Sequence, residues 1–337
     1  MRLIAYSRHH FPLQPLLRPS VISRPIFPSS FTRFYSLKMK LGTHSGTFHA
    51  DEALAIYLLR LLPKYKHSTL LRSRDPALLE TCDLVVDVGG KYDRVKWFDH
   101  HQRGFEETFS PGKTTKLSSA GLVYKHFGPD IIANATDLKG EEAELIYQRV
   151  YENFIEAIDA NDNGISAYPS DIRPSFKNDL SIMSVVDSYN PSWNEDYSNL
   201  DSRFEKASGF IGNIFLEKLK YYAEAWIPAR TLVEDAFSTR FNIHSSGKVI
   251  KFDRSLPWKQ HLLSLPGAED ILYVLYPDGP RFLSKKLLPE EWRGLRDDEL
   301  SRKSKIDGCI FVHANGFTGG VETWDGAVKM VDIAVRA

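Results

Sequence analysis

The sequence has few cysteines, no long apolar run and no net charge, and each absence argues against a class of protein. Two cysteines, Cys82 and Cys309, are too few for a disulfide scaffold or a cysteine-based zinc site, and they favour a reducing compartment. No apolar stretch approaches the roughly 18 residues of a membrane span, so we expect no membrane partner. Equal numbers of basic and acidic residues, 43 of each, argue at first sight against a surface for nucleic acid.

The zero net charge conceals an N-terminal segment without acidic residues. The first 50 residues hold seven Arg and Lys side chains and no Asp or Glu, so the other 287 hold 36 basic and 43 acidic residues. Arg-rich, Ser-containing, acid-free N-termini are typical of organellar transit peptides. The stretch Arg33 to Ser36 resembles a mitochondrial processing site. We therefore predict a disordered mitochondrial presequence over residues 1–38, with an untargeted extension as the alternative.

Beyond this segment, the pattern predicts an α/β fold with two domains. Short apolar runs alternate with helical stretches, and the run at 83–88 suits a strand buried on both faces of a parallel sheet. We predict a parallel-sheet catalytic domain at 39–200, a helical linker at 201–240 and a smaller α+β domain at 241–337. The expected strands lie at 40–44, 68–72, 83–88, 94–98, 248–252, 271–276, 281–287 and 309–313, and the main expected helices at 51–62, 143–158, 203–240 and 326–335.

Histidine and aspartate residues gather where the predicted strands and helices of the first domain end. They are His44, His49, Asp51, Asp87, Asp99, His100, His101, Asp159 and Asp162. In open α/β sheets ligands bind at the carboxyl ends of the strands. Taken singly, each has an ordinary explanation, such as a favourable acid at a helix N-terminus for Asp51 or a turn for Asp162. Such residues occur at the ends of four separate strands or helices, so coincidence is a poor explanation for all of them together.

Imidazole and carboxylate ligands without thiolate suit Mn²⁺, Mg²⁺, Co²⁺ or Zn²⁺ rather than a structural zinc. Asp87 ends an apolar strand, where a carboxylate is costly unless a cation or partner balances it. As a bridging ligand it could hold two divalent cations about 3.5–4 Å apart, the spacing used for hydrolysis at phosphorus. The sequence therefore predicts a two-metal hydrolytic site.

Several longer motifs carry a resemblance to a known family. They are Gly-Thr-His-Ser-Gly-Thr-Phe-His-Ala-Asp-Glu (Gly42 to Glu52), Val-Val-Asp-Val-Gly-Gly (Val85 to Gly90), Phe-Asp-His-His-Gln-Arg (Phe98 to Arg103), Thr-Lys-Leu-Ser-Ser-Ala-Gly (Thr115 to Gly121), Asp-Ala-Asn-Asp-Asn-Gly (Asp159 to Gly164), Trp-Arg-Gly-Leu-Arg-Asp (Trp292 to Asp297) and the stretch Gly308 to Phe317. Together they resemble the melanocyte proliferating gene (Myg) exonuclease family, a relative of the DHH phosphoesterase superfamily. The resemblance runs from about Leu41 to the C-terminus.

The resemblance implies a 3′→5′ exonuclease that acts on single-stranded 3′ ends of RNA, in the mitochondrial matrix and also the nucleus. It implies two divalent cations, foremost Mn²⁺, with Mg²⁺ or Co²⁺ as alternatives. The implied metal ligands are His44, His49, Asp51, the bridging Asp87, His100 and Asp162, with Asp159 as a weaker candidate. The triplet Asp99, His100 and His101 is implied to be catalytic, with His101 orienting or protonating a phosphate oxygen.

The first motif departs from the pattern of the superfamily. Typical members space their ligands as His-x3-Asp-x-Asp, whereas this chain has His44-x4-His49-x-Asp51. A histidine in place of a carboxylate leaves the site less negative by one unit and is expected to affect the metal preference.

Substrate-binding residues are expected mainly in the second domain. Gly319 and Gly320 suggest a loop whose amides hold a phosphate, with an ordinary turn as the alternative. Arg293 and Arg296 are candidate phosphate contacts or residues of a solvated loop. His313 ends an apolar strand, where it either faces the metal cleft or packs as an ordinary histidine. The other candidates are Lys116, Ser118 and Ser119, for which helix capping is an equal alternative, and Trp292, which either stacks a base or packs in a core.

Two other functions remain open at this point. The negative charge of residues 51–337 mildly favours a phosphatase or pyrophosphatase acting on a small phosphorylated metabolite or nucleotide. A non-catalytic RNA-binding scaffold is the third reading. The sequence does not specify an oligomeric state.

Overall fold

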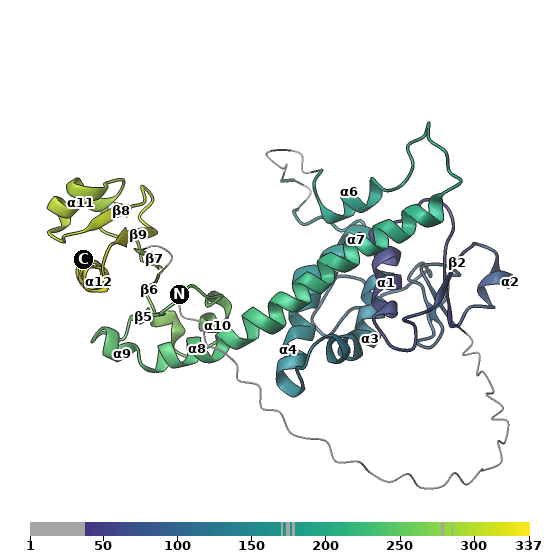
Figure 1. Cartoon of the computed structure of the whole chain (residues 1–337), viewed down its shortest axis with the longest axis horizontal. Coiled ribbons are helices and arrows are strands. Elements are labelled where there is room, and N and C mark those ends of the chain that lie inside the picture. Colours follow the sequence, from purple (N-terminus) through teal and green to yellow (C-terminus); the bar gives the residue numbers. More distant parts are fainter. Residues whose placement is uncertain (1–37, 170, 173–175, 177–178, 278–279, 285) are drawn as a thin grey trace, which may run out of the picture. The chain divides into compact units, whose positions relative to one another are not determined.

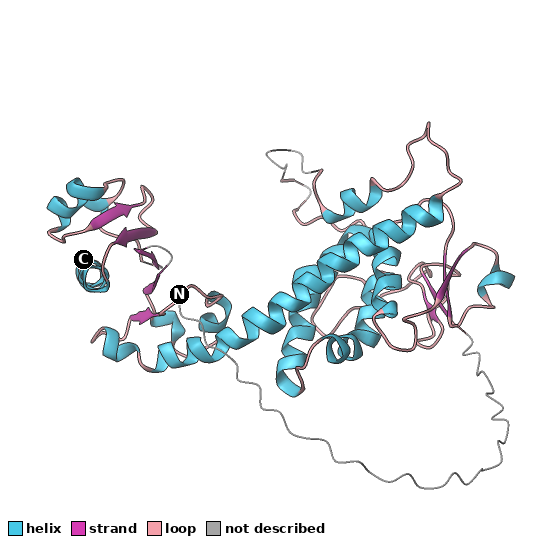
Figure 2. Cartoon of the chain, viewed as in Figure 1, coloured by secondary structure: helices cyan, strands magenta, loops and turns pink. Residues whose placement is uncertain are grey.

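The computed structural model describes residues 38–169, 171–172, 176, 179–277, 280–284 and 286–337. The predicted presequence therefore lies outside the described residues, except for Lys38. The described chain is a mixed α/β structure with strands in two groups, separated along the sequence by helices (Figures 1 and 2). None of the described helices is long and apolar enough to cross a membrane.

The first sheet is parallel and has the order β2-β1-β3-β4. Its strands are β1 (Lys40–Thr43), β2 (Thr69–Arg72), β3 (Leu84–Val86) and β4 (Trp97–Phe98). The chain leaves β1 toward β2 on one side and returns to β3 on the other, so the strand order reverses between β1 and β3. Such a switch point opens a crevice at the carboxyl ends of the two strands.

Helices lie between the strands of this sheet along the chain and follow its last strand. They are α1 (Ala50–Arg60), α2 (Pro76–Leu79), α3 (Ser119–Ala135), α4 (Gly140–Val150), α5 (Glu156–Asp162), α6 (Ile182–Asp187), α7 (Leu200–Tyr221), α8 (Ile227–Ser238) and α9 (Arg240–Ile243). A π-helical turn, Tyr151–Ile155, joins α4 to α5. The short helix α6 lies between α5 and α7 along the chain.

The long helix predicted at 203–240 is α7 and α8, with a π-helical turn at Tyr222–Trp226 between them. The turn ends two residues before Pro228. Proline has no N–H, and its ring crowds the carbonyl four residues earlier; a π-helical turn accommodates both effects. Helix α7 packs on α1, where the hydroxyl of Ser208 donates to the carbonyl of Ala53 at 2.7 Å. Phe204, Ile211 and Phe215 of α7 share one buried core with the first sheet.

The second sheet is mixed and has the order β5-β6-β7-β9-β8. Its elements are β5 (Val249–Lys251), α10 (Lys259–Leu263), β6 (Tyr273–Pro277), β7 (Pro280–Ser284), α11 (Asp297–Ser304), β8 (Cys309–Val312), β9 (Thr318–Val321) and α12 (Trp324–Arg336). Only β5 and β6 pair in parallel; the other neighbours are antiparallel.

Two predictions about local structure are wrong. Gly319 and Gly320 do not form a glycine-rich loop; they are buried in β9, where they pair with both β7 and β8. The strand predicted at 94–98 is reduced to Trp97–Phe98 because Asp93 makes a turn, its Oδ1 accepting the N–H groups of Val95, Lys96 and Trp97.

Candidate metal centre

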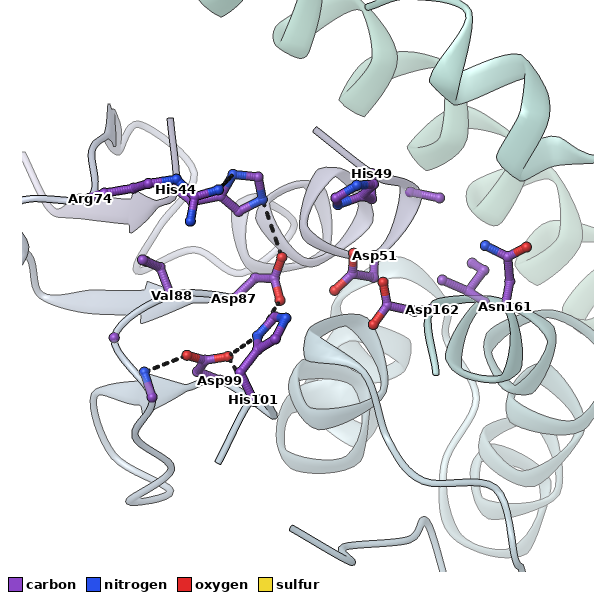
Figure 3. Close-up of a pocket in the computed structure, with 14 residues that line it drawn as sticks. His44, His49, Asp51, Arg74, Asp87, Val88, Asp99, His101, Asn161 and Asp162 are labelled. Atoms are coloured by element: carbon purple, nitrogen blue, oxygen red, sulfur yellow. Dashed lines mark hydrogen bonds and ion pairs between the residues drawn. The ribbon is translucent and has the colours of Figure 1, made fainter. Parts of the chain in front are cut away.

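The predicted ligands lie at the switch point of the first sheet. His44 follows β1, Asp87 follows β3, and Asp99 to His101 follow β4. Because these strands are parallel, their carboxyl ends meet at one edge of the sheet, and the loops after them line a cavity of about 480 Å³ (Figure 3). Asp162, at the end of α5, reaches the same cavity.

Asp87 occupies the centre of the site. Its backbone has a φ of 56°, which is unusual for a residue with a side chain and indicates a local conformation imposed by the surrounding fold. The side chain is buried, and the hydroxyl of Ser119 donates to its Oδ1 at 3.1 Å. The Nε2 atom of His44 lies 3.3 Å from its Oδ2, and the Nε2 atom of His100 lies 3.4 Å from its Oδ1.

The start of α1 supplies two further acids and a histidine. Glu52 accepts the backbone N–H of His49 with both carboxylate oxygens, at 2.9 and 3.0 Å, and so stabilises the first turn of the helix. Its Oε1 also lies 3.0 Å from Nε2 of His44. Asp51 is 1% exposed, and neither of its oxygens has a hydrogen-bond partner among the described residues. Burial of a carboxylate in this state requires a compensating cation or proton.

Three groups of possible ligand atoms overlap at this point, each with its atoms within 4.8 Å of one another. The groups are His44, His49, Glu52 and Asp87; Asp87, His100 and His101; and His49, Asp51 and Asp162. Asp87 belongs to the first two groups, and His49 belongs to the first and third. The shared members allow neighbouring cations to be held by common ligands, as in two-metal sites.

The position of His100 shows whether the possible ligand atoms are arranged as a cation requires. Its Nε2 lies 2.9 Å from Oδ2 of Asp162 and 3.4 Å from Oδ1 of Asp87, yet neither contact has the geometry of a hydrogen bond. The nitrogen and the two oxygens are close without being directed at one another. Such an arrangement fits donor atoms that share a divalent cation, and imidazole with carboxylate suits Mn²⁺, Mg²⁺, Co²⁺ or Zn²⁺.

The electrostatics of the site favour positive charge. Burial lowers the pKa of His44, but the carboxylates of Asp87 and Glu52 outweigh it and raise the pKa to about 10. Burial likewise opposes protonation of His100, but Asp162 and Asp87 raise its pKa to about 10. Burial would raise the pKa of Asp87, but the two imidazoles hold it well below its usual range. The pKa of Asp51 is raised, mainly by burial and next by the negative charges of Asp87 and Asp162.

Asp99 lies beside the cluster and fixes His101. Its carboxylate is 1% exposed and accepts the N–H of Gly90 at 2.6 Å and Nδ1–H of His101 at 2.7 Å. The hydrogen bond from His101 lowers the pKa of Asp99 against the effect of burial, and the same bond is the main cause that raises the pKa of His101. Nδ1 of His101 also lies 3.6 Å from Oδ1 of Asp87. With Nδ1 engaged by Asp99, Nε2 is the nitrogen of this largely exposed imidazole that stays available to a ligand, and His101 is one of the residues that line the cavity.

The two aspartates of α5 have different surroundings. Asp162 lies with His49 and Asp51, whereas Asp159 is outside the three groups of possible ligands. Oδ1 of Asp159 accepts the backbone N–H of Ser118 at 2.9 Å and its hydroxyl at 2.7 Å. Burial raises the pKa of Asp159 to about 7 against these hydrogen bonds. Asp159 therefore supports the start of α3 and does not contribute to the cluster.

The predicted substrate contacts of the first domain do not line the cavity. Ser118 and Ser119 are fully buried and bonded to Asp159 and Asp87, respectively. The Nζ atom of Lys116 lies 2.8 Å from Oε1 of Glu106. Each serine thus supports an aspartate of the site region. Ser118 occupies the N-cap position of α3, but its side chain makes no capping hydrogen bond, because its hydroxyl donates to Asp159.

The predicted contacts in the region of the second sheet are not among the described residues that line the cavity. Nε of Arg293 donates to the carbonyl of Leu288 at 3.0 Å, and the guanidinium of Arg296 lies 5.9 Å from the ring centre of Phe311. Nδ1 of His313 accepts the N–H of Asn315 at 3.1 Å. Gly319 and Gly320 are strand residues, as described above. Trp292 is 2% exposed and belongs to a hydrophobic core, so it is a packing residue.

Two residues of the site were missed by the sequence analysis. Glu52 follows Asp51 directly, and its position in the first turn of a helix was the signal that could have identified it. Arg74 follows β2 and reaches the same sheet edge, its Nε donating to the carbonyl of Ser45 at 3.2 Å. Among the described residues that line the cavity, Arg74 is the only arginine or lysine.

Comparison with known proteins identifies the family. The model of MYG1_exonuc, described as an uncharacterised protein family (UPF0160), matches residues 40–335. The chain belongs to the MYG1 family. It is 46% identical to the MYG1 protein C694.04c of Schizosaccharomyces pombe, over 87% of this chain and 96% of that protein.

Relatives in mammals carry a more specific name. The chain is 44% identical to the MYG1 exonuclease of Homo sapiens, over 86% of this chain and 84% of that protein, and 42% identical to the MYG1 exonuclease of Bos taurus, over 97% and 93%. No solved structure matches the chain. The predicted family resemblance is thereby confirmed for the MYG1 family.

Proposed function

We propose that this MYG1 family member is a metal-dependent phosphodiesterase with a DHH-type catalytic domain that removes nucleotides from the 3′ end of RNA. The observation that carries the proposal is the position of Asp87, whose carboxylate is shared by the groups around His44 and His100 at the switch point of the sheet. The mammalian relatives are named exonucleases. A shared carboxylate between two sets of imidazole and carboxylate ligands suits a two-metal phosphoryl site.

The residues that would hold two divalent cations come from five loops and helix ends. They are His44, His49, Asp51, Asp87, His100 and Asp162, with Glu52 beside His44 and His49. When bound, such cations supply Lewis acidity and lower the pKa of a bound water, and Mn²⁺ is the cation we favour. The buried acids Asp51 and Asp87 would provide the negative charge that retains them.

His101 is the residue that we assign to proton transfer. Asp99 holds Nδ1–H of this imidazole, so that Nε2 presents a proton to the cavity. In the hydrolysis of the terminal phosphodiester, water adds to phosphorus and the bond to O3′ of the penultimate nucleotide breaks. His101 would give its proton to that oxygen, and a nucleoside 5′-monophosphate would be released. Arg74 would bind a non-bridging oxygen of the phosphate through its guanidinium.

The substrate and the location of the protein are further parts of the proposal. We propose single-stranded 3′ ends of RNA as the partner, and the mitochondrial matrix, with the nucleus as a second location, as the place of action. The acid-free, Arg-rich N-terminal segment supports mitochondrial import. The test is a fusion of residues 1–38 to a fluorescent reporter: mitochondrial signal supports import, and a diffuse cytosolic signal contradicts it.

One alternative has a specific observation in its favour. The excess of acidic residues in 51–337 is better suited to a small phosphorylated metabolite or nucleotide than to a long polyanion. A phosphatase or pyrophosphatase would use the same cations and the same Arg74. A non-catalytic RNA-binding scaffold does not require the cluster of buried acids.

A single set of assays separates these functions. Purified protein with Mn²⁺ is given end-labelled RNA, DNA, dinucleotides and pyrophosphate, beside the variants Asp87→Ala and His100→Ala. Stepwise shortening of RNA from its 3′ end, lost in both variants, is the expected result. Turnover restricted to pyrophosphate or a small nucleotide would favour the alternative enzyme. RNA binding without turnover, unchanged in both variants, would identify a scaffold.

A further inference from the structure

Trp193 is a large aromatic residue whose side chain is almost completely exposed to solvent. Its exposed fraction is 90%, the highest among the large hydrophobic residues that the structure describes as exposed. Trp97, Trp226 and Trp292, by contrast, are at most 6% exposed. A fully exposed indole gains nothing from the hydrophobic core, whereas its large π face is well suited to a planar ligand.

The turn that carries Trp193 is tied to the metal centre. The side-chain amide of Asn190 donates to the carbonyl of Phe48 at 2.8 Å and accepts the N–H of the same residue at 3.1 Å. Phe48 directly precedes His49, a member of two groups of possible metal ligands. Three residues of chain span at most about 11 Å, so Trp193 lies within that distance of Asn190, which is bonded to the residue before His49.

A second set of contacts keeps this turn in shape. The N–H of Ser192 donates to Oε2 of Glu195 at 2.9 Å, and the N–H of Glu195 donates to the carbonyl of Ser192 at 2.9 Å. Glu195 is in turn paired with Arg203 at 3.2 Å, in the first turn of α7. Trp193 therefore lies between two fixed points, and binding of a ligand to its ring costs little ordering of the backbone.

The charges around the turn favour contact with a base over contact with a phosphate. Arg203 is engaged by Glu195, and Arg72 is engaged by Asp201 at 3.2 Å. The carboxylate of Asp196 accepts the N–H of Ser198 at 2.9 Å and leaves the turn slightly acidic. The ring of Trp193 is thus the feature that nucleic acid would use here, and stacking tolerates every base because each has a π face.

We infer that Trp193 stacks on a base of single-stranded RNA close to the cleaved phosphodiester and so gives the enzyme its preference for oligonucleotides over small phosphodiesters. This inference rests on the proposed nuclease function, and it adds a substrate contact outside the cation-binding cluster. The contact belongs to the part of the chain between α6 and α7, and not to the second sheet in which base and phosphate contacts were expected.

The test compares Trp193→Ala and Trp193→Phe on two substrates with Mn²⁺: a short single-stranded RNA and methyl p-nitrophenyl phosphate, which has no base. We expect Trp193→Ala to raise KM for RNA about ten-fold or more, because loss of one stacked base weakens binding by that order. Turnover of the small diester should be unchanged, and Trp193→Phe should retain most of the RNA affinity. Tyr221→Ala, at an exposed aromatic residue of α7, is the matched control and should behave as the unaltered protein.

Two results would overturn the inference. Equal KM values for RNA in the unaltered protein and Trp193→Ala would exclude a stacking role, and an equal loss on both substrates would indicate a structural one. Failure of the proposed function is seen separately, as absence of RNA cleavage by the unaltered protein. In that case tryptophan fluorescence decides: quenching by added RNA that is lost in Trp193→Phe supports stacking, and absence of quenching in the unaltered protein refutes it.

Discussion

Oδ1 of Asp99 lies 2.7 Å from Nδ1 of His101, and this contact leaves Nε2 as the nitrogen of the imidazole that is available to a ligand. The carboxylate of Asp99 also accepts the N–H of Gly90, which lies in the turn after β3. The position of this turn therefore helps to set the orientation of the His101 ring. In the proposed mechanism, Asp99 is thus a positioning residue, and His101 is the residue that would reach the reacting atoms.

For Asp99→Asn we expect a loss of kcat of about 100-fold or more, because an amide no longer accepts from Nδ1–H with the strength of a carboxylate and permits the wrong tautomer. Binding of Mn²⁺ should change little, because Asp99 lies outside the groups of possible ligands. Steady-state kinetics and calorimetric titration with Mn²⁺ measure the two effects. A loss of metal affinity as large as the loss of kcat would contradict this division of roles.

Asp51→Asn should stabilise the protein in EDTA while abolishing its stabilisation by Mn²⁺. The Asp51 carboxylate is buried, unpartnered and repelled by Asp87 and Asp162, so its charge opposes folding unless a cation is present. Thermal unfolding with EDTA and with Mn²⁺ gives both values. Asp75→Asn, which alters an exposed acid at the start of α2, is the control; a lower Tm for Asp51→Asn in EDTA would be the opposite of the expected result.

Gly121→Ala should destabilise the protein, whereas Gly209→Ala should not. A Cβ at Gly121 of α3 would lie 2.3 Å from Oδ1 of Asp159, which would force this carboxylate away from Ser118. We expect a loss of about 1–3 kcal/mol, the range for a buried polar group that loses its partner. A Cβ at Gly209 of α7 meets nothing within 4 Å, so the gain in helix propensity of about 0.5–1 kcal/mol should dominate. Denaturant unfolding measures both, and equal effects would refute the steric argument.

His261 should make the stability depend on pH below about 6.5. Burial lowers the pKa of His261. The hydrogen bond from Nε2 to the carbonyl of Trp226, 2.8 Å away, acts in the opposite direction and raises it. The charges of Arg230 and Arg149 lower the pKa further, and the charge of Glu234 raises it. The unfolded state therefore binds this proton more readily, and stability that is fully present above pH 6.5 falls as the pH is lowered. The slope from one group is at most about 1.4 kcal/mol per pH unit.

His261→Gln, which keeps a side-chain donor but does not titrate, is the comparison for this effect. The difference in unfolding free energy between the unaltered protein and His261→Gln should narrow or reverse between pH 7.5 and pH 5.5, because only the unaltered protein carries the His261 contribution. A difference that stays constant across this range would show that His261 does not titrate with folding.

The first sheet and its ligands could be predicted because their signals are local. Continuous apolar runs mark β3, and the polar residues directly after β1, β3 and β4 follow from the rule that parallel strands present their carboxyl ends at one edge. What could not be predicted depends on contacts between distant residues. The bond between Asp159 and Ser118 joins positions 41 apart, and the bond between Asn190 and Phe48 joins positions 142 apart.

The second sheet was harder to predict for a different reason. Thr-Gly-Gly-Val at β9 has the composition of a turn, and only its pairing with β7 and β8 makes it a strand. Arg293, Arg296 and His313 carry the chemistry expected of substrate contacts, but charge alone does not locate a side chain. Arg74 shows the opposite case. No motif in the sequence marks it as a site residue, yet the fold of the first sheet places it at the cavity.

The packing of α7 on α1 has a consequence for how this protein can be divided. Gly212 lies so close to the ring of Tyr57 that an added Cβ would be 2.1 Å away, and Phe204 is buried against Phe48. A fragment that ended at residue 200 would leave the apolar face of α1 in water and would be expected to aggregate. The smallest piece expected to fold with its candidate metal centre intact therefore includes α7. Exchange of the C-terminal region between relatives is expected to succeed only at a junction beyond this helix.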